Sequence, residues 1–328
     1  MHGKKQNNKD KSKKDIPQSS SAPRYSGIAT FMRTPLVQDP SGIDIALIGV
    51  PYDGAVEGRS GARHGPREIR NMSSMIRTIH HATRINPYKL CNIADMGDVP
   101  FTNVYRPEEV HNDIMNYYKK VHEAGVVPLS AGGDHSISLP ILRVLGKEIP
   151  VGLVHIDAHT DTNDTEMGFK FSHGTPFRRA VEEGTLDAKR TVQIGIRGTQ
   201  NSEESWDFSI ESGMRVIFME EFTALGVNGV IDQVRLVVGD GPVYISFDID
   251  GLDPAFAPGT GTPEIGGMTT VEAQTLLRGL RGLNLIGADV VEVAPPFDPS
   301  GNTALVAATI MFEILCLLAE AISLQKKQ

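Results

Sequence analysis

Side chains that can bind metal ions follow three apolar runs of the chain at the point where each run ends. One run ends in a Gly-Gly turn shortly before a histidine, and the other two end directly before an aspartate. Alternate residues of an extended chain point to the same side, so ligands spaced by two can leave each strand on one face. The set comprises four carboxylates and two imidazoles: His135, Asp157, His159, Asp161, Asp248 and Asp250.

Four carboxylates cannot all stay ionised close together without compensating positive charge, because each charge disfavours the ionised form of its neighbours. Two divalent cations would supply that charge. Imidazole and carboxylate ligands suit manganese, nickel, iron or zinc, and the lack of thiolates argues against a structural zinc site. Taken singly, each acid could be an N-cap or loop residue, and His135 could be a buried core histidine. The six together predict a binuclear metal centre.

Apolar runs alternate with helical stretches from residue 43 onward, which is typical of βαβ units in a parallel sheet. Buried parallel strands read as continuous apolar runs, and their carboxyl ends are where open α/β sheets place ligands. The expected helices include 107–123, 269–280 and 303–324. The expected strands are 44–50, 90–96, 126–129, 151–156, 191–196, 215–218, 243–247 and 285–291. This pattern leaves two architectures open, a three-layer sandwich and a closed eight-stranded barrel.

Basic residues concentrate at the start of the chain. The net charge is −8, but residues 1–15 carry six lysines and two aspartates, so the remaining chain has a net charge of −12. An acidic body is unsuited to nucleic acid. We expect residues 1–22 to form a disordered basic tail and residues 23–328 to form a single catalytic domain. A polyanion-binding arm is the alternative interpretation of the tail.

The cysteine count and the hydropathy of the sequence indicate the cellular compartment of the protein. The two cysteines, Cys91 and Cys316, lie in apolar surroundings and have no partner motif, so we expect a reducing compartment and no disulfide framework. We expect no apolar run long enough to span a bilayer, and no apolar signal-peptide core follows the basic start. The prediction is a cytoplasmic protein with neither membrane nor nucleic-acid partners.

Five segments carry most of these residues in a recognisable order. They are GGDHS at 132–136, DAHTDTND at 157–164, SHGTPFR at 172–178, SFDIDGLDPAFAPGTGTP at 246–263 and EVAPPFD at 292–298. Together they resemble the signature segments of the arginase/agmatinase family, the ureohydrolases. The resemblance implies an α/β fold, a three-layer α/β/α sandwich around an eight-stranded parallel sheet. It would decide between the two architectures.

The resemblance also implies how the ligands divide between two metal ions. One ion would be bound by His135, Asp157, Asp161 and Asp248, and the other by Asp157, His159, Asp248 and Asp250. Manganese is expected first and nickel second, because both accept these ligands. The family likeness further implies a homotrimer or homohexamer, with a homologous subunit as a possible partner.

The reaction implied is hydrolysis of a guanidino compound to urea and an amine. A guanidinium carbon is a poor electrophile, so a hydroxide that bridges the two metals is the expected nucleophile. By resemblance, Asp161 orients this hydroxide, His173 protonates the leaving amine near the working pH, and Glu292 pairs with the guanidinium. His155 is expected to support the ligands rather than bind metal, Asp134 and Asp253 to stabilise their loops, and Asn163 to face the distal end of the substrate.

The substrate class is less settled by the residues. Segments 24–33, 61–75 and 173–184 resemble guanidino-acid hydrolases, which implies 3-guanidinopropionate or 4-guanidinobutyrate as substrate. However, the segment GAVEGRSG at 54–61 places Glu57 where relatives carry a small hydroxyl residue. If Glu57 lines the pocket, it would favour agmatine, guanidine or a biguanide such as metformin. The alternative is that Glu57 points to solvent or pairs with Arg59 or Arg63.

Two further functions differ in class. A non-catalytic subunit of a ureohydrolase assembly would lack a ligand or the proton-transfer histidine, and neither is missing from the sequence. A single-metal deacetylase would share metal-assisted hydrolysis, but the paired DAHTD and DID segments favour two metals.

Overall fold

The computed structural model describes residues 23–202 and 204–326, so the predicted basic tail lies outside the described residues. The described chain contains an eight-stranded parallel sheet in the order β2-β1-β3-β8-β7-β4-β5-β6. The strands are β1 (Ile45–Val50), β2 (Ile93–Asp98), β3 (Val127–Gly132), β4 (Val151–Ile156), β5 (Leu186–Ile196), β6 (Arg215–Phe218), β7 (Val243–Asp248) and β8 (Leu285–Val291). Strands β2 and β6 are edges, so the sheet is open and the sandwich prediction is confirmed.

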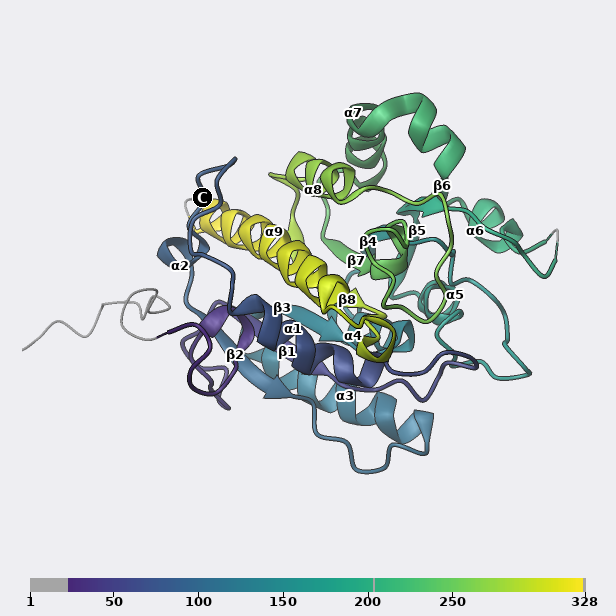
Figure 1. Ribbon diagram of the computed structural model, residues 1–328. Coiled ribbons are helices and arrows are strands. Elements are labelled where there is room, and N and C mark those ends of the chain that lie inside the picture. Colours follow the sequence, from purple (N-terminus) through teal and green to yellow (C-terminus); the bar gives the residue numbers. More distant parts are fainter. Residues whose placement is uncertain (1–22, 203, 327–328) are drawn as a thin grey trace, which may run out of the picture.

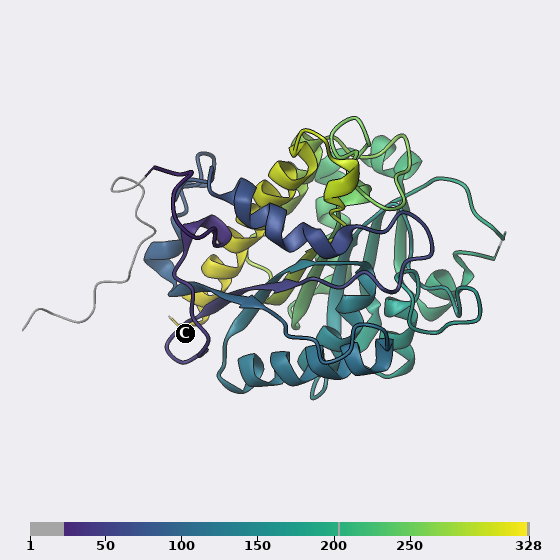
Figure 2. The same cartoon turned by 60° about the horizontal axis from the view of Figure 1, so that its bottom comes forward.

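Helices cover both faces of this sheet (Figure 1, Figure 2). Helices α1 (Gly65–Ser73), α2 (Pro87–Leu90), α7 (Met219–Val238), α8 (Thr270–Gly279) and α9 (Asn302–Gln325) lie together on one face. Helices α3 (Pro107–Glu123), α4 (Ser138–Leu145) and α5 (Pro176–Glu182) lie on the other. The short helix α6 (Asp207–Ser212) packs beside β5 and β6. Single 3-10 turns occur at Phe31–Arg33, Ala62–His64, His135–Ile137, Ile249–Gly251 and Pro295–Phe297.

The central strands are apolar throughout because both of their faces are covered. Every residue of β4 and β7 is buried. Along β4, Val154 and Ile156 pack in the core that contains α9, whereas Val151 and Leu153 pack in the core that contains α3. This alternation follows from the two-residue period of a strand. The continuous apolar runs in the sequence therefore indicated these strands correctly.

Helix α9 corrects one expectation from the sequence. By length and composition it could cross a membrane, contrary to the prediction that no apolar run is long enough. However, 78% of its apolar window is buried within the fold, as in the core helix of a globular domain. The buried Glu313 of α9 also lies 2.8 Å from His80 Nε2 and accepts a hydrogen bond of 2.5 Å from Arg278 on α8. Its composition therefore reflects burial against the sheet.

Candidate active site

Four neighbouring strands carry the predicted site residues at one edge of the sheet. Strands β3, β8, β7 and β4 lie side by side in that order, although they are far apart in the sequence. Because the strands are parallel, their carboxyl ends meet at the same edge, where ligands of open α/β sheets bind. His135 follows β3, the Asp157 group follows β4, Asp248 ends β7, and Glu292 follows β8. The structure thus brings the six predicted metal ligands and Glu292 together.

The first ligand group surrounds His135. Its Nδ1 lies 2.8 Å from an oxygen of Asp161, 3.2 Å from Asp157 and 3.3 Å from Asp248, yet it is buried without a hydrogen bond. The turn before it requires glycine, because a Cβ at Gly133 would lie 1.7 Å from the backbone oxygen of Tyr52. Three carboxylates therefore converge on one imidazole nitrogen.

Hydrogen bonds on the far side of His135 assign its tautomer. The Ser246 hydroxyl donates to Asp289 Oδ1 at 2.6 Å, so its oxygen accepts from His135 Nε2 at 2.8 Å. Asp289 also accepts from Ser138 and Tyr244. A neutral imidazole that donates through Nε2 presents a lone pair at Nδ1. Three carboxylate oxygens facing this nitrogen fit a cation between them, either a metal ion or a proton. Burial acts to lower the pKa of His135, but these oxygens raise it well above its ordinary value.

The second ligand group surrounds His159. Its Nδ1 lies 3.4 Å from Asp157 Oδ1 and 3.2 Å from Asp250 Oδ2. Asp157 therefore turns one oxygen to each group, as the predicted bridging ligand must. Asp248 turns Oδ2 to His135, whereas its Oδ1 accepts the backbone N–H of Asp250 at 2.9 Å. The bridging role of Asp248 stays a prediction.

The protein leaves much of this negative charge uncompensated. Burial, together with the charges of Asp250 and Asp157, raises the pKa of Asp248 well above its ordinary value. Burial and Asp157 also raise the pKa of Asp161 and of Asp250. Burial acts to raise the pKa of Asp157 too, but His155 and His135 hold it well below its ordinary value. Three raised carboxyl pKa values indicate a cluster in need of positive charge, so these residues fit divalent cations.

His155 supports this cluster from within β4. The Gln193 amide donates to His155 Nδ1 at 3.1 Å and to the backbone oxygen of Thr160 at 2.6 Å. The remaining ring nitrogen, Nε2, therefore carries hydrogen and donates to Asp157 Oδ2 at 2.7 Å. His155 is close enough to count among potential ligands, but this bond gives it the supporting position that the sequence indicated.

Asp134 and Asp253 accept hydrogen bonds from the backbone of loops around the cluster, the role predicted for them from the sequence. Asp134 accepts hydrogen bonds from Ser136 and, at 2.9 Å, from the backbone N–H of Ala55. Asp253 accepts from the backbone of Ala255 and Gly266. Both carboxylates therefore stabilise the loops that surround the cluster.

Glu292 and His173 lie next to the metal-ligand cluster. Glu292 Oε1 accepts the backbone N–H of His135 at 2.9 Å and lies 3.3 Å from His173 Nδ1. Burial acts to lower the pKa of His173, but the hydrogen bond and charge of Glu292 raise it to about 10. This differs from the expected titration near the working pH. The pairing with Glu292 therefore favours the protonated ring, the form that can donate a proton.

Two of the site residues have left-handed backbone conformations. Asp161 has a φ of 51° and Glu292 a φ of 63°. Such conformations are costly for residues other than glycine and cluster at functional sites. In both cases the backbone turns sharply within a few residues of the strand end, and the turned carboxylate faces the cluster.

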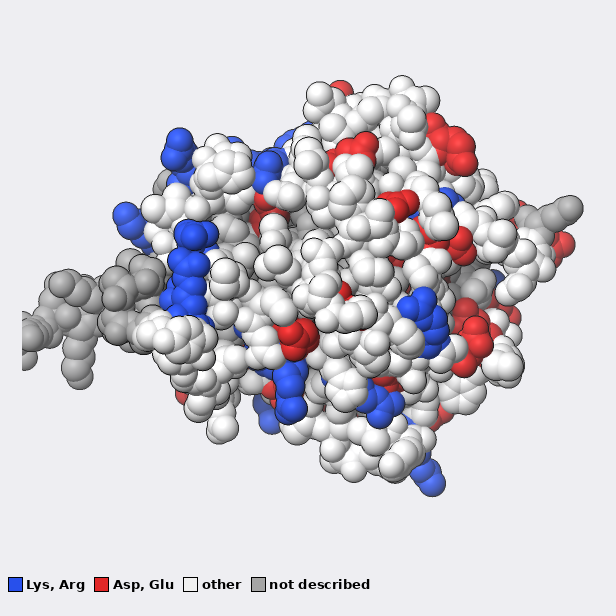
Figure 3. Space-filling view, in the orientation of Figure 1, with Lys and Arg blue, Asp and Glu red and all other residues white. Residues whose placement is uncertain are grey.

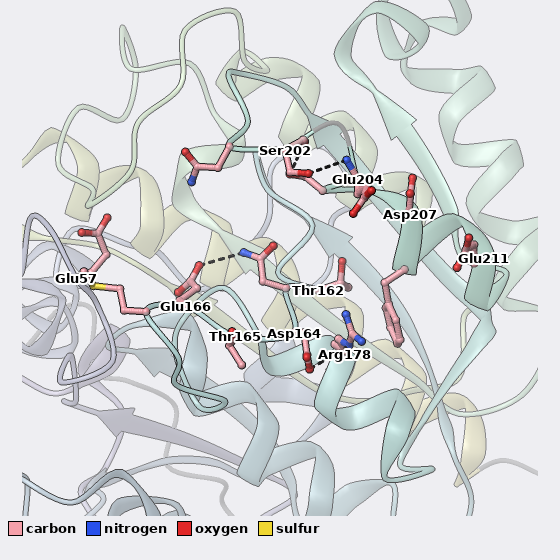
Figure 4. A pocket seen from close by; sticks show the side chains of 15 residues that line it. Glu57, Thr162, Asp164, Thr165, Glu166, Arg178, Ser202, Glu204, Asp207 and Glu211 are labelled. Carbon is pink, nitrogen blue, oxygen red and sulfur yellow. Dashed lines mark hydrogen bonds and ion pairs between the residues drawn. The ribbon is translucent and has the colours of Figure 1, made fainter.

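A cavity of about 740 Å³ lies outside the cluster (Figure 4). Two of the three predicted substrate contacts, Glu57 and Asn163, line it, whereas Glu292 lies at the cluster and is not part of its lining. Among the described residues its lining has one guanidinium, Arg178, which pairs with Asp164 and Glu182. Six carboxylates also line it: Glu57, Asp164, Glu166, Glu204, Asp207 and Glu211. Acidic side chains gather on the α5 and α6 side of the molecule (Figure 3).

Glu57 is exposed at this cavity, and its two possible partners are engaged elsewhere. Arg63 pairs with Asp53, and Arg59 lies 4.0 Å from the ring centre of Phe297. Neither arginine therefore pairs with Glu57, while its exposure agrees with the other part of the alternative, in which Glu57 points to solvent. Its contact with substrate stays a prediction.

Several supporting residues were missed in the sequence. Ser246 contacts the ligand His135, Gln193 contacts His155 and Asp289 contacts Ser246, and each of the three interrupts an apolar run inside a strand. A lone polar residue in a buried strand requires a hydrogen-bond partner, and that signal could have marked them.

Replacing Ser246 tests the support of His135. We expect Ser246→Ala to weaken Mn²⁺ binding about 10- to 100-fold, because the His135 ring loses the bond that fixes its tautomer. Metal titration by calorimetry measures this loss. Ser73→Ala, at an equally buried serine on α1, is the control. Equal affinities of the Ser246 and Ser73 variants would contradict the account.

Residues 43–317 match the arginase family. Guanidinopropionase of Pseudomonas aeruginosa is 58% identical over 94% of this chain and 98% of the relative, and guanidinobutyrase of the same organism is 50% identical over 90% and 94%. The solved structure of proclavaminate amidino hydrolase from Streptomyces clavuligerus is 41% identical, with a TM-score of 0.88 over 92% of this chain and 100% of that one. This chain therefore belongs to the arginase family.

Proposed function

We propose that this protein is a binuclear-metal amidinohydrolase that hydrolyses a guanidino compound to urea and an amine. The observation that supports this most is the convergence of three carboxylate oxygens on His135 Nδ1. One ion would be held by His135, Asp157, Asp161 and Asp248, and the other by Asp157, His159, Asp248 and Asp250. Bound there, two divalent cations would supply a water acidic enough to attack a guanidinium carbon at neutral pH.

Residues of the chain would orient the two reactants. Asp161, held by its left-handed backbone at the cluster, would accept a hydrogen bond from the attacking water. Glu292 would pair with the substrate guanidinium, since an ionised carboxylate is the natural partner of that group. Its position is fixed by the bond from the His135 backbone, so the substrate carbon would be held next to the metal ligands.

His173 would complete the reaction by moving a proton. When the C–N bond breaks, its electron pair stays on the leaving nitrogen, which takes the proton from the His173 imidazolium. The imidazole then regains a proton from solvent. Although burial acts to lower the pKa of His173, the hydrogen bond and charge of Glu292 raise it and so favour the protonated ring before the reaction begins.

The proposed substrates are guanidino acids such as 3-guanidinopropionate and 4-guanidinobutyrate. The two relatives reported above, named guanidinopropionase and guanidinobutyrase, support this class. Their similarity extends over most of the chain, including the segments that surround the cavity.

A second candidate is a cationic or carboxylate-free substrate, such as agmatine, guanidine or a biguanide. One observation favours it: six carboxylates and a single, already paired guanidinium line the cavity. A substrate carboxylate entering this cavity would be repelled, whereas a cation would be attracted.

All six ligands and His173 lie among the described residues, which supports an enzyme over a non-catalytic subunit. Manganese stays the first choice of metal and nickel the second, since these ligands suit both. The homotrimer or homohexamer, the homologous subunit and the cytoplasmic location stay predictions.

Urea release tests the reaction and the role of His173 together. We expect the metal-loaded protein to release urea from 3-guanidinopropionate, and His173→Asn to lower kcat about 100- to 10,000-fold, because the leaving amine loses its proton donor. Metal content should not change. His122→Asn, at an exposed histidine of α3, is the control. Full activity in the His173 variant would remove it from the mechanism.

Replacing Glu57 tests how the cavity selects charge. We expect Glu57→Thr to raise kcat/KM for 3-guanidinopropionate relative to agmatine about tenfold, because a negative charge leaves the cavity, a change of ~1.4 kcal/mol. Glu57→Gln keeps the size of the side chain and should have the same effect. If neither variant alters the ratio, Glu57 does not sense substrate charge.

A further inference from the structure

Glu166 lies on the opposite side of His173 from Glu292. Glu292 Oε1 is 3.3 Å from His173 Nδ1, and Glu166 Oε2 is 3.9 Å from His173 Nε2. Each ring nitrogen thus faces its own carboxylate. Glu166 belongs to none of the segments that carry the family resemblance, because it falls between 157–164 and 172–178.

The backbone around Glu166 is tightly closed. Glu166 and Phe169 exchange two backbone hydrogen bonds of 2.8 and 2.9 Å, and the two residues between them, Met167 and Gly168, have φ angles of 49° and 82°. This is the pattern of a type I′ turn. At its base the loop is closed by the bond from the Asn163 N–H to the Gly174 oxygen at 3.0 Å. Glu166 is therefore held at a fixed position.

Neighbouring residues fix the position of the Glu166 carboxylate. Its Oε1 accepts a hydrogen bond from Asn163 Nδ2 at 3.1 Å (Figure 4). The same oxygen packs on Gly174, where a Cβ would lie only 2.1 Å away. Oε2, the oxygen that approaches His173, is buried and has no hydrogen-bond partner among the described residues. A buried, unsatisfied carboxylate oxygen is costly, and an imidazolium beside it offsets that cost.

Acidic groups lie near His173 on four of the segments around it, and on a fifth the Ala55 backbone oxygen accepts the His173 backbone N–H at 3.2 Å. The acidic groups are Glu292 after β8, Glu166 in the loop, Asp161 after β4 and Asp134 after β3. Burial acts to lower the pKa of His173, while Glu292, Asp161 and Glu166 act to raise it. Of these, Glu292 and Glu166 come within ion-pair distance of the ring nitrogens.

We propose that Glu166 is a positioning residue for His173: it holds the Nε2 side of the imidazolium ring at the cavity and keeps the proton there until the leaving amine takes it. The proposal rests on the proposed function, in which His173 is the proton donor. It also explains why Asn163 and Gly174 lie against the same carboxylate: both fix its direction.

The isosteric variant Glu166→Gln tests the proposal in the metal-loaded protein. It removes one negative charge beside the imidazolium, so the proton is lost at lower pH. We expect the alkaline limb of the kcat profile to move down by about 1 pH unit. NMR titration of the His173 ring should move by the same amount, which is a readout that needs no activity. Gly174→Ala, which displaces the carboxylate while keeping its charge, should shift both in the same direction.

Glu211→Gln is the charge-matched control. It removes an acid from the same cavity and should shift both curves much less. If Glu166→Gln leaves the His173 titration and the kcat profile where they were while the unmodified protein releases urea, the proposal is wrong and the proposed function stands. If no guanidino compound yields urea, the proposed function fails, and the His173 titration alone still decides whether Glu166 holds the proton.

Discussion

The structure depends on the burial of four carboxylates at the carboxyl edge of one sheet. Asp157, Asp161, Asp248 and Asp250 are each at most 8% exposed, and their charges meet around two imidazole rings. Such a cluster is unstable unless cations or protons neutralise it. The buried negative charge destabilises the fold, and the same charge suits the cluster to bind two divalent cations. The surrounding hydrogen bonds serve to keep the oxygens pointed inward.

The strand order of the sheet brings these carboxylates together. Strands β3, β8, β7 and β4 are neighbours, so side chains from distant parts of the chain come within 2.8 to 3.3 Å of one another at their carboxyl ends. Helices cover both faces of the strands beneath, and in that buried interior Ser246 contacts His135, Asp289 accepts from Ser246, and Gln193 donates to His155. The packed strands thus support the acidic loops at their carboxyl ends, where the substrate would enter.

Much of this arrangement could be predicted from local patterns. The apolar runs gave the ends of β4, β6 and β8 to the residue, and the spacing of Asp157, His159 and Asp161 indicated their common face. The strand order could not be read, because it depends on contacts between distant segments. The lone polar residues inside strands were overlooked for the same reason: their partners lie on other strands. No apolar run was expected to be long enough to span a membrane, but α9 is long and apolar enough. Its burial in the core explains this apolar composition.

The central claim is that two cations share one site through Asp157. Anomalous diffraction from crystals grown with Mn²⁺ measures this directly. The account predicts two peaks about 3.5–4 Å apart, one next to His135 and Asp161 and the other next to His159 and Asp250, with Asp157 touching both. A single peak at this edge of the sheet, or none in protein that releases urea, would contradict it.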